Sequence, residues 1–368
     1  MSGWPEVELG EICEFKYGKS LPAEARDGGP FPVYGSNGVV GSHSAAITGA
    51  PVVIIGRKGS FGEIEYSTSP CWPIDTTYFV DSAGTKTDLK WLSYRLRGLG
   101  LTTLNRAAAI PGLNREDAYR QRLLLPPLDE QRRIAAILDQ AGALRAKRRQ
   151  VLAHFDALAQ SIFHDMFDGR QTKTTLLGDV AEVVSGITKG RRTVDPTQPF
   201  PYLAVANVQA GHLKLDTVKT IDATDSEVSR FALRTGDLVL TEGGDPDKLG
   251  RGTVWRGEIT TCLHQNHVFR VRLNRDSQVL PEYLSAFLAG REAKSYFLRS
   301  AKQTTGIASI NMTQLKGLSI VVPPLMDQSR YVERIANINS CVDRAKESLT
   351  MHDRLFSALQ SRAFRGEL

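Results

Sequence analysis

The chain has 368 residues, more than one ordinary hydrophobic core accommodates, and this length predicts at least two domains. Its composition, 41% hydrophobic and 23% charged, is typical of a soluble globular protein, and no apolar run approaches the roughly 20 residues of a membrane helix. The net charge of +6 is compatible with nucleic-acid binding and is unevenly distributed: residues 172–321 carry 19 basic and 15 acidic side chains, whereas residues 1–124 carry 13 of each.

The cysteines and the N-terminus indicate the cellular compartment. The N-terminal residues lack the basic and apolar regions of a signal peptide. The cysteines are scattered, with no CxxC pair, so their spacing predicts neither a zinc site nor a disulfide framework. They are Cys13, Cys71, Cys262 and Cys341. We therefore expect a cytoplasmic protein with reduced thiols, no metal and no cofactor.

Residues 1–125 are predicted to form a mixed α/β domain, which we call the first head. The apolar run at residues 52–55 is typical of a buried strand, and residues 89–101 are predicted to form a helix. Glycine-rich turns at residues 27–30 and 36–38 separate these elements.

Residues 126–171 are predicted to form one long helix. Pro126 and Pro127 suit an extended approach to a helix start, and Gly169 suits its end. Apolar residues recur at the three- and four-residue spacing of a coiled-coil seam, interrupted at Arg148. The seam consists of Ile134, Ile137, Ala141, Leu144, Val151, Phe155, Leu158 and Ile162. A helix of about 40 residues is about 60 Å long and needs a partner to bury this seam.

Residues 172–322 are predicted to form a second mixed α/β domain, the second head, and residues 323–368 a second long helix. Residues 238–240 and 268–273 are typical of strands, and residues 281–298 of a helix. The seam of the last helix is interrupted at His352. It consists of Ile335, Ile338, Val342, Ala345, Leu349, Phe356, Leu359 and Ala363.

The two halves of the chain repeat each other. Val322-Pro323-Pro324-Leu325 repeats Leu125-Pro126-Pro127-Leu128 at an offset of 197, and Leu177-Gly178-Asp179 repeats Leu9-Gly10-Glu11 at an offset of 168. The second head therefore carries about 29 additional residues. We predict an α+β fold with a pseudo-two-fold internal repeat, in which two heads are joined by two long, antiparallel coiled-coil helices.

The sequence lacks the motifs of the catalytic sites that we considered. An amino-methyltransferase grips its flipped base with a polar residue before Pro-Pro-Tyr or Pro-Pro-Phe, but here leucine or valine flanks both proline pairs. His264 and His267 are three residues apart without a third candidate ligand, so we do not predict a metal site there. The sequence predicts no enzyme active site.

The duplicated Pro-Pro-Leu segments, the glutamine that follows each, and the terminal Phe364-Arg365-Gly366-Glu367-Leu368 resemble the specificity subunits of type I restriction-modification systems. The resemblance covers essentially the whole chain. It implies two target-recognition domains that each read half of a bipartite DNA site, with the long helices setting the spacer. It also implies adenine-methyltransferase (modification) subunits docked on the helices and a separate motor-endonuclease (restriction) subunit.

Polar and basic side chains in predicted loops are the candidates for contact with double-stranded DNA. In the first head these are Lys16, Lys19, Ser36, Asn37, Arg57, Lys58, Ser60 and Arg106. In the second head they are Lys189, Arg191, Arg192, Asn207, Lys248, Arg251, Gln265, Asn266, Lys302 and Gln303. The candidates for contact with partner subunits are Gln131, Arg145, Arg148, Gln328 and Arg344.

Two other interpretations remain open at this point. A coiled-coil adaptor that binds only proteins would fit the seams but leaves two divergent, loop-rich heads without a use. A stand-alone DNA methyltransferase would need the catalytic loop that the sequence lacks.

Overall fold

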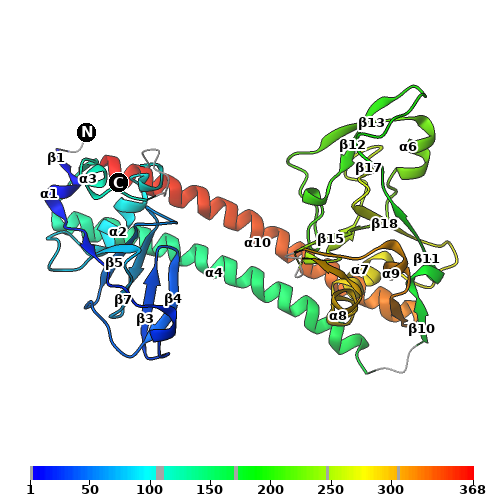
Figure 1. The fold of residues 1–368 in the computed structure, drawn as a ribbon, viewed down its shortest axis with the longest axis horizontal. Coiled ribbons are helices and arrows are strands. Elements are labelled where there is room, and N and C mark those ends of the chain that lie inside the picture. The colour runs from blue at the N-terminus through cyan, green and yellow to red at the C-terminus, as the bar shows by residue number, and fades with distance from the viewer. Residues whose placement is uncertain (1–2, 105–111, 170–172, 246–247, 305–306) are drawn as a thin grey trace. The chain divides into compact units, whose positions relative to one another are not determined.

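The computed structural model describes residues 3–104, 112–169, 173–245, 248–304 and 307–368, which divide into two compact units. The first unit combines Met1–Leu152 with Arg344–Leu368, and the second is Ala153–Asp343. The long helices α4 (Leu128–Phe167) and α10 (Leu325–Arg365) each contribute to both units (Figure 1). Within the described ranges, no helix is both long and apolar enough to cross a membrane.

The first head contains a four-stranded antiparallel sheet, β2-β8-β5-β6, and a three-stranded sheet, β4-β3-β7, in which β3 and β7 are parallel. A separate pair, β1-β9, joins its two ends. The strands are β1 (Glu6–Glu8), β2 (Lys16–Tyr17), β3 (Phe31–Gly35), β4 (Gly38–His43), β5 (Val52–Gly56), β6 (Ile64–Ser67), β7 (Trp72–Pro73), β8 (Thr77–Val80) and β9 (Arg122–Leu124). The helices are α1 (Leu9–Ile12), α2 (Leu89–Arg97) and α3 (Arg115–Tyr119).

The second head has the same strand orders. Its sheets are β11-β18-β14-β16 and β13-β12-β17, and a pair β10-β21 joins its ends. The strands are β10 (Lys173–Leu176), β11 (Ala181–Ser185), β12 (Gln198–Leu203), β13 (Lys219–Ala223), β14 (Leu238–Thr241), β15 (Gly243–Gly244), β16 (Gly252–Val254), β17 (Leu263–His264), β18 (Val268–Leu273), β19 (Lys302–Thr304), β20 (Ile307–Ser309) and β21 (Ser319–Val322). The helices are α5 (Leu177–Val180), α6 (Asp225–Phe231), α7 (Pro281–Ala289), α8 (Arg291–Ser300) and α9 (Met312–Lys316).

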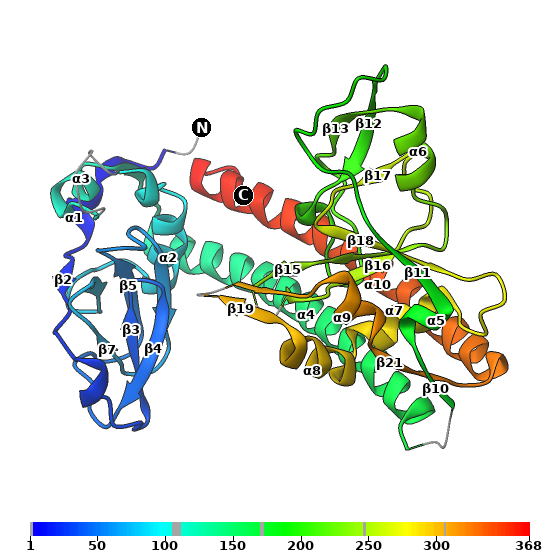
Figure 2. The same cartoon turned by 45° about the vertical axis from the view of Figure 1, so that its right-hand side comes forward.

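Additional elements account for the greater length of the second head. Helix α6 lies against the sheet of β12, β13 and β17 (Figure 2). Strands β15, β20 and β19 form a further sheet. In the second head β15 pairs with β20. At the equivalent place in the described part of the first head there is an isolated β-bridge between Lys58 and Gly112.

Strands β5 and β14 are interior strands of the two four-stranded sheets, and both are buried on both faces. Successive side chains of a strand point to opposite sides of the sheet, so each strand contributes to two clusters. In β5, Val53 and Ile55 pack in the cluster that contains Trp91 of α2, whereas Val52 and Ile54 pack with Cys71. Strand β14 repeats this arrangement. The strands predicted at residues 52–55, 238–240 and 268–273 are confirmed.

Two helix predictions need correction. The helix predicted over residues 89–101 ends at Arg97, and Gly100 follows in the left-handed region at φ 66°. The helix predicted over residues 281–298 is two helices, because Gly290 is extended at ψ 168° and ends α7 where α8 begins. At Gly100 glycine allows this positive φ at little steric cost, whereas the extended conformation of Gly290 is open to any residue.

Both long helices are confirmed, and they pair in each unit. In the first unit Arg133 donates to the Leu368 carbonyl at 3.0 Å and Arg145 donates to Asp353 at 2.5 Å, so the helices run antiparallel there. In the second unit the ring of Phe163 on α4 contacts that of Tyr331 on α10, with 5.5 Å between centroids.

The predicted seam is partly wrong. Leu144 and Leu158 are 49% and 46% exposed. Leu138, which the predicted seam omits, is fully buried because the first turns of α4 pack into the core of the first head. A helix that packs on a head as well as on a partner helix buries a wider stripe than a coiled-coil spacing describes.

The glutamine after each Pro-Pro-Leu segment fixes the start of a long helix. Gln131 Nε2 donates to the Pro126 carbonyl at 2.8 Å, and its Oε1 accepts from the amide of Asp88, the N-cap of α2, at 2.8 Å. Gln328 makes the same two bonds in the second unit, with Pro323 and with Leu280, the N-cap of α7. Each glutamine therefore ties a long helix to the helix that covers the head's sheet.

Candidate nucleic-acid interface

One loop position recurs in both heads and carries several predicted DNA contacts. It follows β5 in the first head and β14 in the second, the third strand in each four-stranded order. The Arg57 carbonyl accepts from the Leu113 amide, and the Glu242 carbonyl accepts from the Ile310 amide, both at 2.9 Å. The predicted residues on these two loops are Arg57, Lys58, Ser60, Lys248 and Arg251.

In the first head Arg57 is held over exposed aromatic surface. Its guanidinium carbon lies 4.9 Å from the ring centre of Tyr17 and 5.7 Å from that of Tyr78, and Nη1 donates to the Asp75 carbonyl at 3.0 Å. The guanidinium of Arg115 lies 5.5 Å from the Tyr17 ring. Because Tyr17 is 51% exposed, this cluster presents two fixed cations and a ring at the surface. Sequence reasoning missed Tyr17 and Arg115, which lie far from Arg57 in the chain.

The other first-head candidates divide by their contacts. Lys16 is paired with Asp81 at 2.7 Å, and the Ser36 hydroxyl donates to the Thr76 carbonyl at 2.6 Å, so both side chains serve the head's own structure. This placement argues against the DNA contact predicted for them. The exposed candidates are Lys19, Asn37, Lys58 and Ser60, and Arg106 lies outside the described residues.

In the second head, a pocket of about 300 Å³ gathers basic side chains. Lys248, Arg251 and Lys294 line it, together with Gln209 and His212. The Arg251 Nε is buried without a hydrogen-bond partner in the described chain, and Lys248 is paired with Asp245. Three cations around one hollow favour a phosphate group. Lys294 comes from α8, far along the sequence, so the loop pattern alone did not indicate it.

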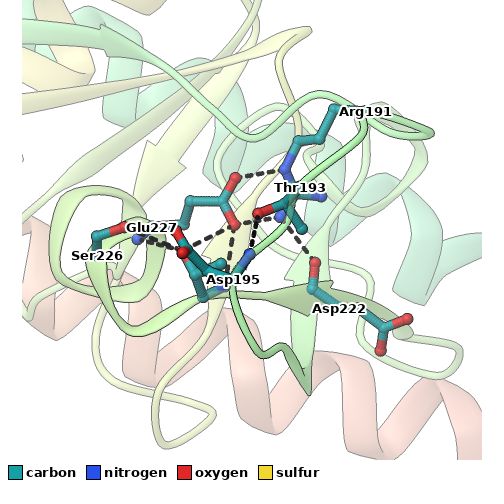
Figure 3. A network of polar contacts seen from close by, with 7 residues as sticks. Arg191, Thr193, Asp195, Asp222, Ser226 and Glu227 are labelled. Atoms are coloured by element: carbon teal, nitrogen blue, oxygen red, sulfur yellow. Dashed lines mark hydrogen bonds and ion pairs between the residues drawn. The ribbon is translucent and has the colours of Figure 1, made fainter.

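Arg191 makes its hydrogen bonds inside the second head, which argues against its predicted contact with DNA. Figure 3 shows its guanidinium directed at Glu227, to which it donates two hydrogen bonds, and at the main chain of Asp222. The bond to the Asp222 carbonyl is 2.8 Å long. Arg191 therefore anchors its loop to α6 and β13, while its neighbours Lys189 and Arg192 are exposed.

The contact between Arg191 and Glu227 changes the pKa of the Glu227 carboxyl. The hydrogen bonds from Arg191 lower the pKa of Glu227 to about 2 against the opposing effect of burial. The Thr224 amide, at 3.0 Å, contributes in the same direction. A carboxylate with a lowered pKa stabilises the folded state only while it stays ionised.

We expect Glu227→Gln to destabilise the protein at neutral pH and much less in acid. The folded pKa of about 2 lies below the ordinary 4.5, so the stabilising contribution is complete above pH 4.5 and is lost as the pH falls toward 2. Urea unfolding of wild type and variant at a series of pH values measures the difference in unfolding free energy. Glu333→Gln, an exposed change on α10, is the control. A difference that stayed constant from pH 6 to pH 3 would contradict the predicted role.

The remaining second-head candidates are placed as follows. Asn207 is 6% exposed and its Nδ2 donates to the carbonyls of Lys214 and Thr217 at 2.8 and 3.0 Å, which argues against its predicted DNA contact. Gln265 and Asn266 are half-buried beside β17, and Lys302 is exposed on β19. The backbone of Gln303 belongs to β19, and its side chain lies outside the described residues.

The partner-contact predictions need a similar correction. Gln131 and Gln328 are 4% and 0% exposed and bonded internally, which argues against direct docking on their side chains. Arg145 pairs with Asp353 and lies 4.4 Å from the ring centre of Phe356. The last two candidates, Arg148 and Arg344, are exposed on α4 and α10.

The two histidines considered above have separate environments. His264 is fully buried, with Nδ1 2.7 Å from the Val268 carbonyl, and burial lowers its pKa to about 4. His267 is exposed and its Nδ1 lies 2.8 Å from Glu242. Among the described residues no group of three or more histidine, cysteine, aspartate or glutamate side chains is placed to hold a metal ion.

Comparison with known sequences identifies relatives. Residues 1–154 match the family described as "Type I restriction modification DNA specificity domain". The EcoKI specificity subunit of Escherichia coli K12 is 24% identical over 268 residues, which cover 66% of this chain and 57% of that protein. The StySPI subunit of Salmonella potsdam gives 24% over 266 residues, with the same coverage, so the chain spans less than two thirds of these two relatives. The EcoDI subunit of E. coli is 23% identical over 402 aligned positions, covering 99% and 88%.

Solved structures share the fold. The S subunit of a type I system from M. genitalium aligns with a TM-score of 0.58 at 14% identity and covers 98% of this chain and 96% of its own. A chain from a structure on complex assembly and conformational transition of the type I R-M system aligns with a TM-score of 0.56 at 15% identity, covering 100% and 99%. The predicted mixed α/β fold with two long helices is thus confirmed, as is the resemblance inferred from the repeat.

Proposed function

We infer that this chain is the DNA-reading subunit of a type I restriction-modification complex and has no catalytic centre of its own. Its residues 1–154 match the type I restriction modification DNA specificity domain. The observation that carries this proposal is the loop shared by the two heads. The same backbone position follows the third strand of each four-stranded sheet. The loop that begins there carries basic side chains in both heads, Arg57 and Lys58 in the first and Lys248 and Arg251 in the second.

Each head is proposed to read one half of a bipartite site on double-stranded DNA. Cations such as Lys58, Lys189 and Arg192 would contact phosphates, which fix the register of a protein on the duplex but carry no sequence information. Base edges in the major groove would be read by side chains held in a fixed geometry, such as Arg57. Because the two loops share a scaffold but differ in sequence, the two half-sites would differ.

The long helices are proposed to set the spacer between the half-sites. Helices of 40 and 41 residues are about 60 Å long, equivalent to about 18 base pairs at 3.4 Å per step. The pseudo-two-fold arrangement of the heads belongs to this proposal. It is supported by the repeated strand orders and by the equivalent bonds of Gln131 and Gln328.

Adenine-methylating modification subunits are proposed to dock on the long helices, with a motor-endonuclease subunit joining the complex. Large apolar side chains stand exposed there: Leu144 is 49%, Met351 is 66% and Leu355 is 49% exposed. Equivalent hollows also flank the two helix starts. One, of about 830 Å³, is lined by Leu125, Pro126 and Leu128, and the other, of about 680 Å³, by residues 322–325. Matched surfaces suit a partner that binds twice.

Selection from randomised duplex DNA tests the proposal. The full-length chain in complex with a type I modification subunit is expected to enrich two short sequence blocks separated by an unread spacer. A single continuous block would contradict the bipartite reading. Binding of the modification subunit without any retention of DNA would instead favour a protein adaptor, and methyl transfer from AdoMet by the isolated chain would favour a stand-alone methyltransferase.

A further inference from the structure

The residue that begins the shared loop differs in charge between the two heads. The pairing of β5 with β8 sets Gly56 opposite Thr77, and that of β14 with β18 sets Thr241 opposite Val268. The next residues are Arg57 and Glu242. Their amides donate to Thr76 and His267 carbonyls at 2.8 and 3.0 Å, and their carbonyls accept from Leu113 and Ile310, both at 2.9 Å. Arg57 and Glu242 therefore occupy the same backbone position.

The surroundings change together with this residue. Strand pairing sets Tyr17 against Tyr78 in the first head and Ser185 against Phe269 in the second. The first residue after the asparagine N-cap of the following short helix is Arg115 in α3 and Met312 in α9. Among the described residues, the tyrosine and arginine that surround Arg57 in the first head are thus not repeated at the equivalent positions near Glu242.

A chain of hydrogen bonds orients Glu242 instead. Asn266 Nδ2 lies 3.4 Å from His267 Nε2, and His267 Nδ1 lies 2.8 Å from Glu242 Oε2. Both distances fit a neutral imidazole that accepts from the amide and donates to the carboxylate. Glu242 is 31% and His267 57% exposed, and Oε1 of Glu242 makes no hydrogen bond within the described chain. One carboxylate oxygen of Glu242 is therefore held by His267, while the other is not hydrogen-bonded to the described residues.

A carboxylate at a DNA-facing position is repelled by phosphates, so backbone contact does not account for it. In the major groove the partners of an acidic side chain are exocyclic amino groups, cytosine N4 above all, whereas a guanidinium pairs with guanine O6 and N7. We propose that Glu242, positioned by His267 and Asn266, is a specificity-determining residue of the second head. It accepts a hydrogen bond from the amino group of cytosine or adenine in one half-site, and Arg57 reads guanine at the equivalent position of the other. This inference rests on the proposed function.

Selection with variant chains tests the assignment. Wild type, Glu242→Gln and Arg57→Gln, each full-length and bound to a modification subunit, are selected on randomised duplexes and sequenced. We expect Glu242→Gln to lose the preference for an amino-bearing base at one position of one block, with affinity for the wild-type site reduced roughly ten- to a hundredfold. Arg57→Gln is expected to lose a guanine preference in the other block only. Glu333→Gln, which removes a carboxylate from α10, should leave both blocks unchanged.

Different failures point to different errors. If Glu242→Gln keeps every base preference of the wild type, the assignment of Glu242 is wrong although the bipartite function stands. A uniform change in affinity for all sequences also overturns it, because that is the behaviour of a charge acting on phosphates. Glu242→Asp, which keeps the carboxylate, should retain the base preference with weaker binding; loss of all preference in this variant would indicate a structural role. If the wild type shows no preference, the proposed function itself fails.

Discussion

Gln328→Ala is expected to lower the stability of the second unit by about 3 kcal/mol. The Gln328 side chain is 0% exposed and makes three hydrogen bonds, each 2.8 Å long, to the Leu280 amide and the carbonyls of Gln278 and Pro323. Alanine leaves these three backbone groups buried without partners, and each such group costs about 1–3 kcal/mol, with partial relief if water enters. The contact between the start of α10 and the cap of α7 would loosen first.

Hydrogen exchange measures this effect directly. The Leu280 amide, which donates to Gln328 in the wild type, should exchange faster in the variant, together with the amides of α7. Gln131→Ala should produce the same change at the Asp88 amide in the first unit. Gln160→Ala, an exposed change on α4, should stay within about 0.5 kcal/mol of the wild type. Unchanged exchange at Leu280 would show that the glutamine is not the tie between the two helices.

Removal of one heptad from each long helix is expected to shorten the recognised spacer by about 3 base pairs, since seven residues span about 10.5 Å of helix and one base-pair step is about 3.4 Å. The deletions must match because the helices run antiparallel, with Arg145 opposite Asp353. Residues 146–152 and 346–352 satisfy this register. Whole heptads keep the remaining apolar stripes nearly in phase, with a rotation of about 20°.

Selection from randomised DNA provides the measurement. The two sequence blocks should be the same as in the wild type, and only the distance between them should change. Deletion from α4 alone is the control, since it destroys the register and should abolish the bipartite site. A shortened protein that kept the wild-type spacer would show that the helices do not set the distance, while leaving the base assignments of each head intact.

The sequence alone predicted the features that a repeated pattern encodes. Two offsets, 197 at the Pro-Pro-Leu segments and 168 at the Leu-Gly segments, predicted the duplication and the greater length of the second head. Apolar spacing predicted both long helices, and apolar runs predicted strands β5, β14 and β18. These predictions succeed because the buried residues of a helix or strand recur with the period of that element.

Only the tertiary structure decided which polar side chains face outward. Four predicted contact residues are of the types that bind DNA or partners, yet each makes its hydrogen bonds inside the protein. They are Asn207, Arg191, Gln131 and Gln328. Residue type does not distinguish the two uses, because an exposed amide and a buried one differ only in which chain segments fold back on them.

The tertiary structure also decided that Arg57 and Glu242 are equivalent. Their offset in the sequence is 185, which matches neither repeated offset, because the second head has additional residues both before and after this loop. Strand pairing recovers the equivalence, since backbone hydrogen bonds fix register whatever the loops between the strands contain. The sequence pattern was thus sufficient to predict the scaffold. Which side chains occupy equivalent positions on it depends on the pairing of strands that are distant in the sequence.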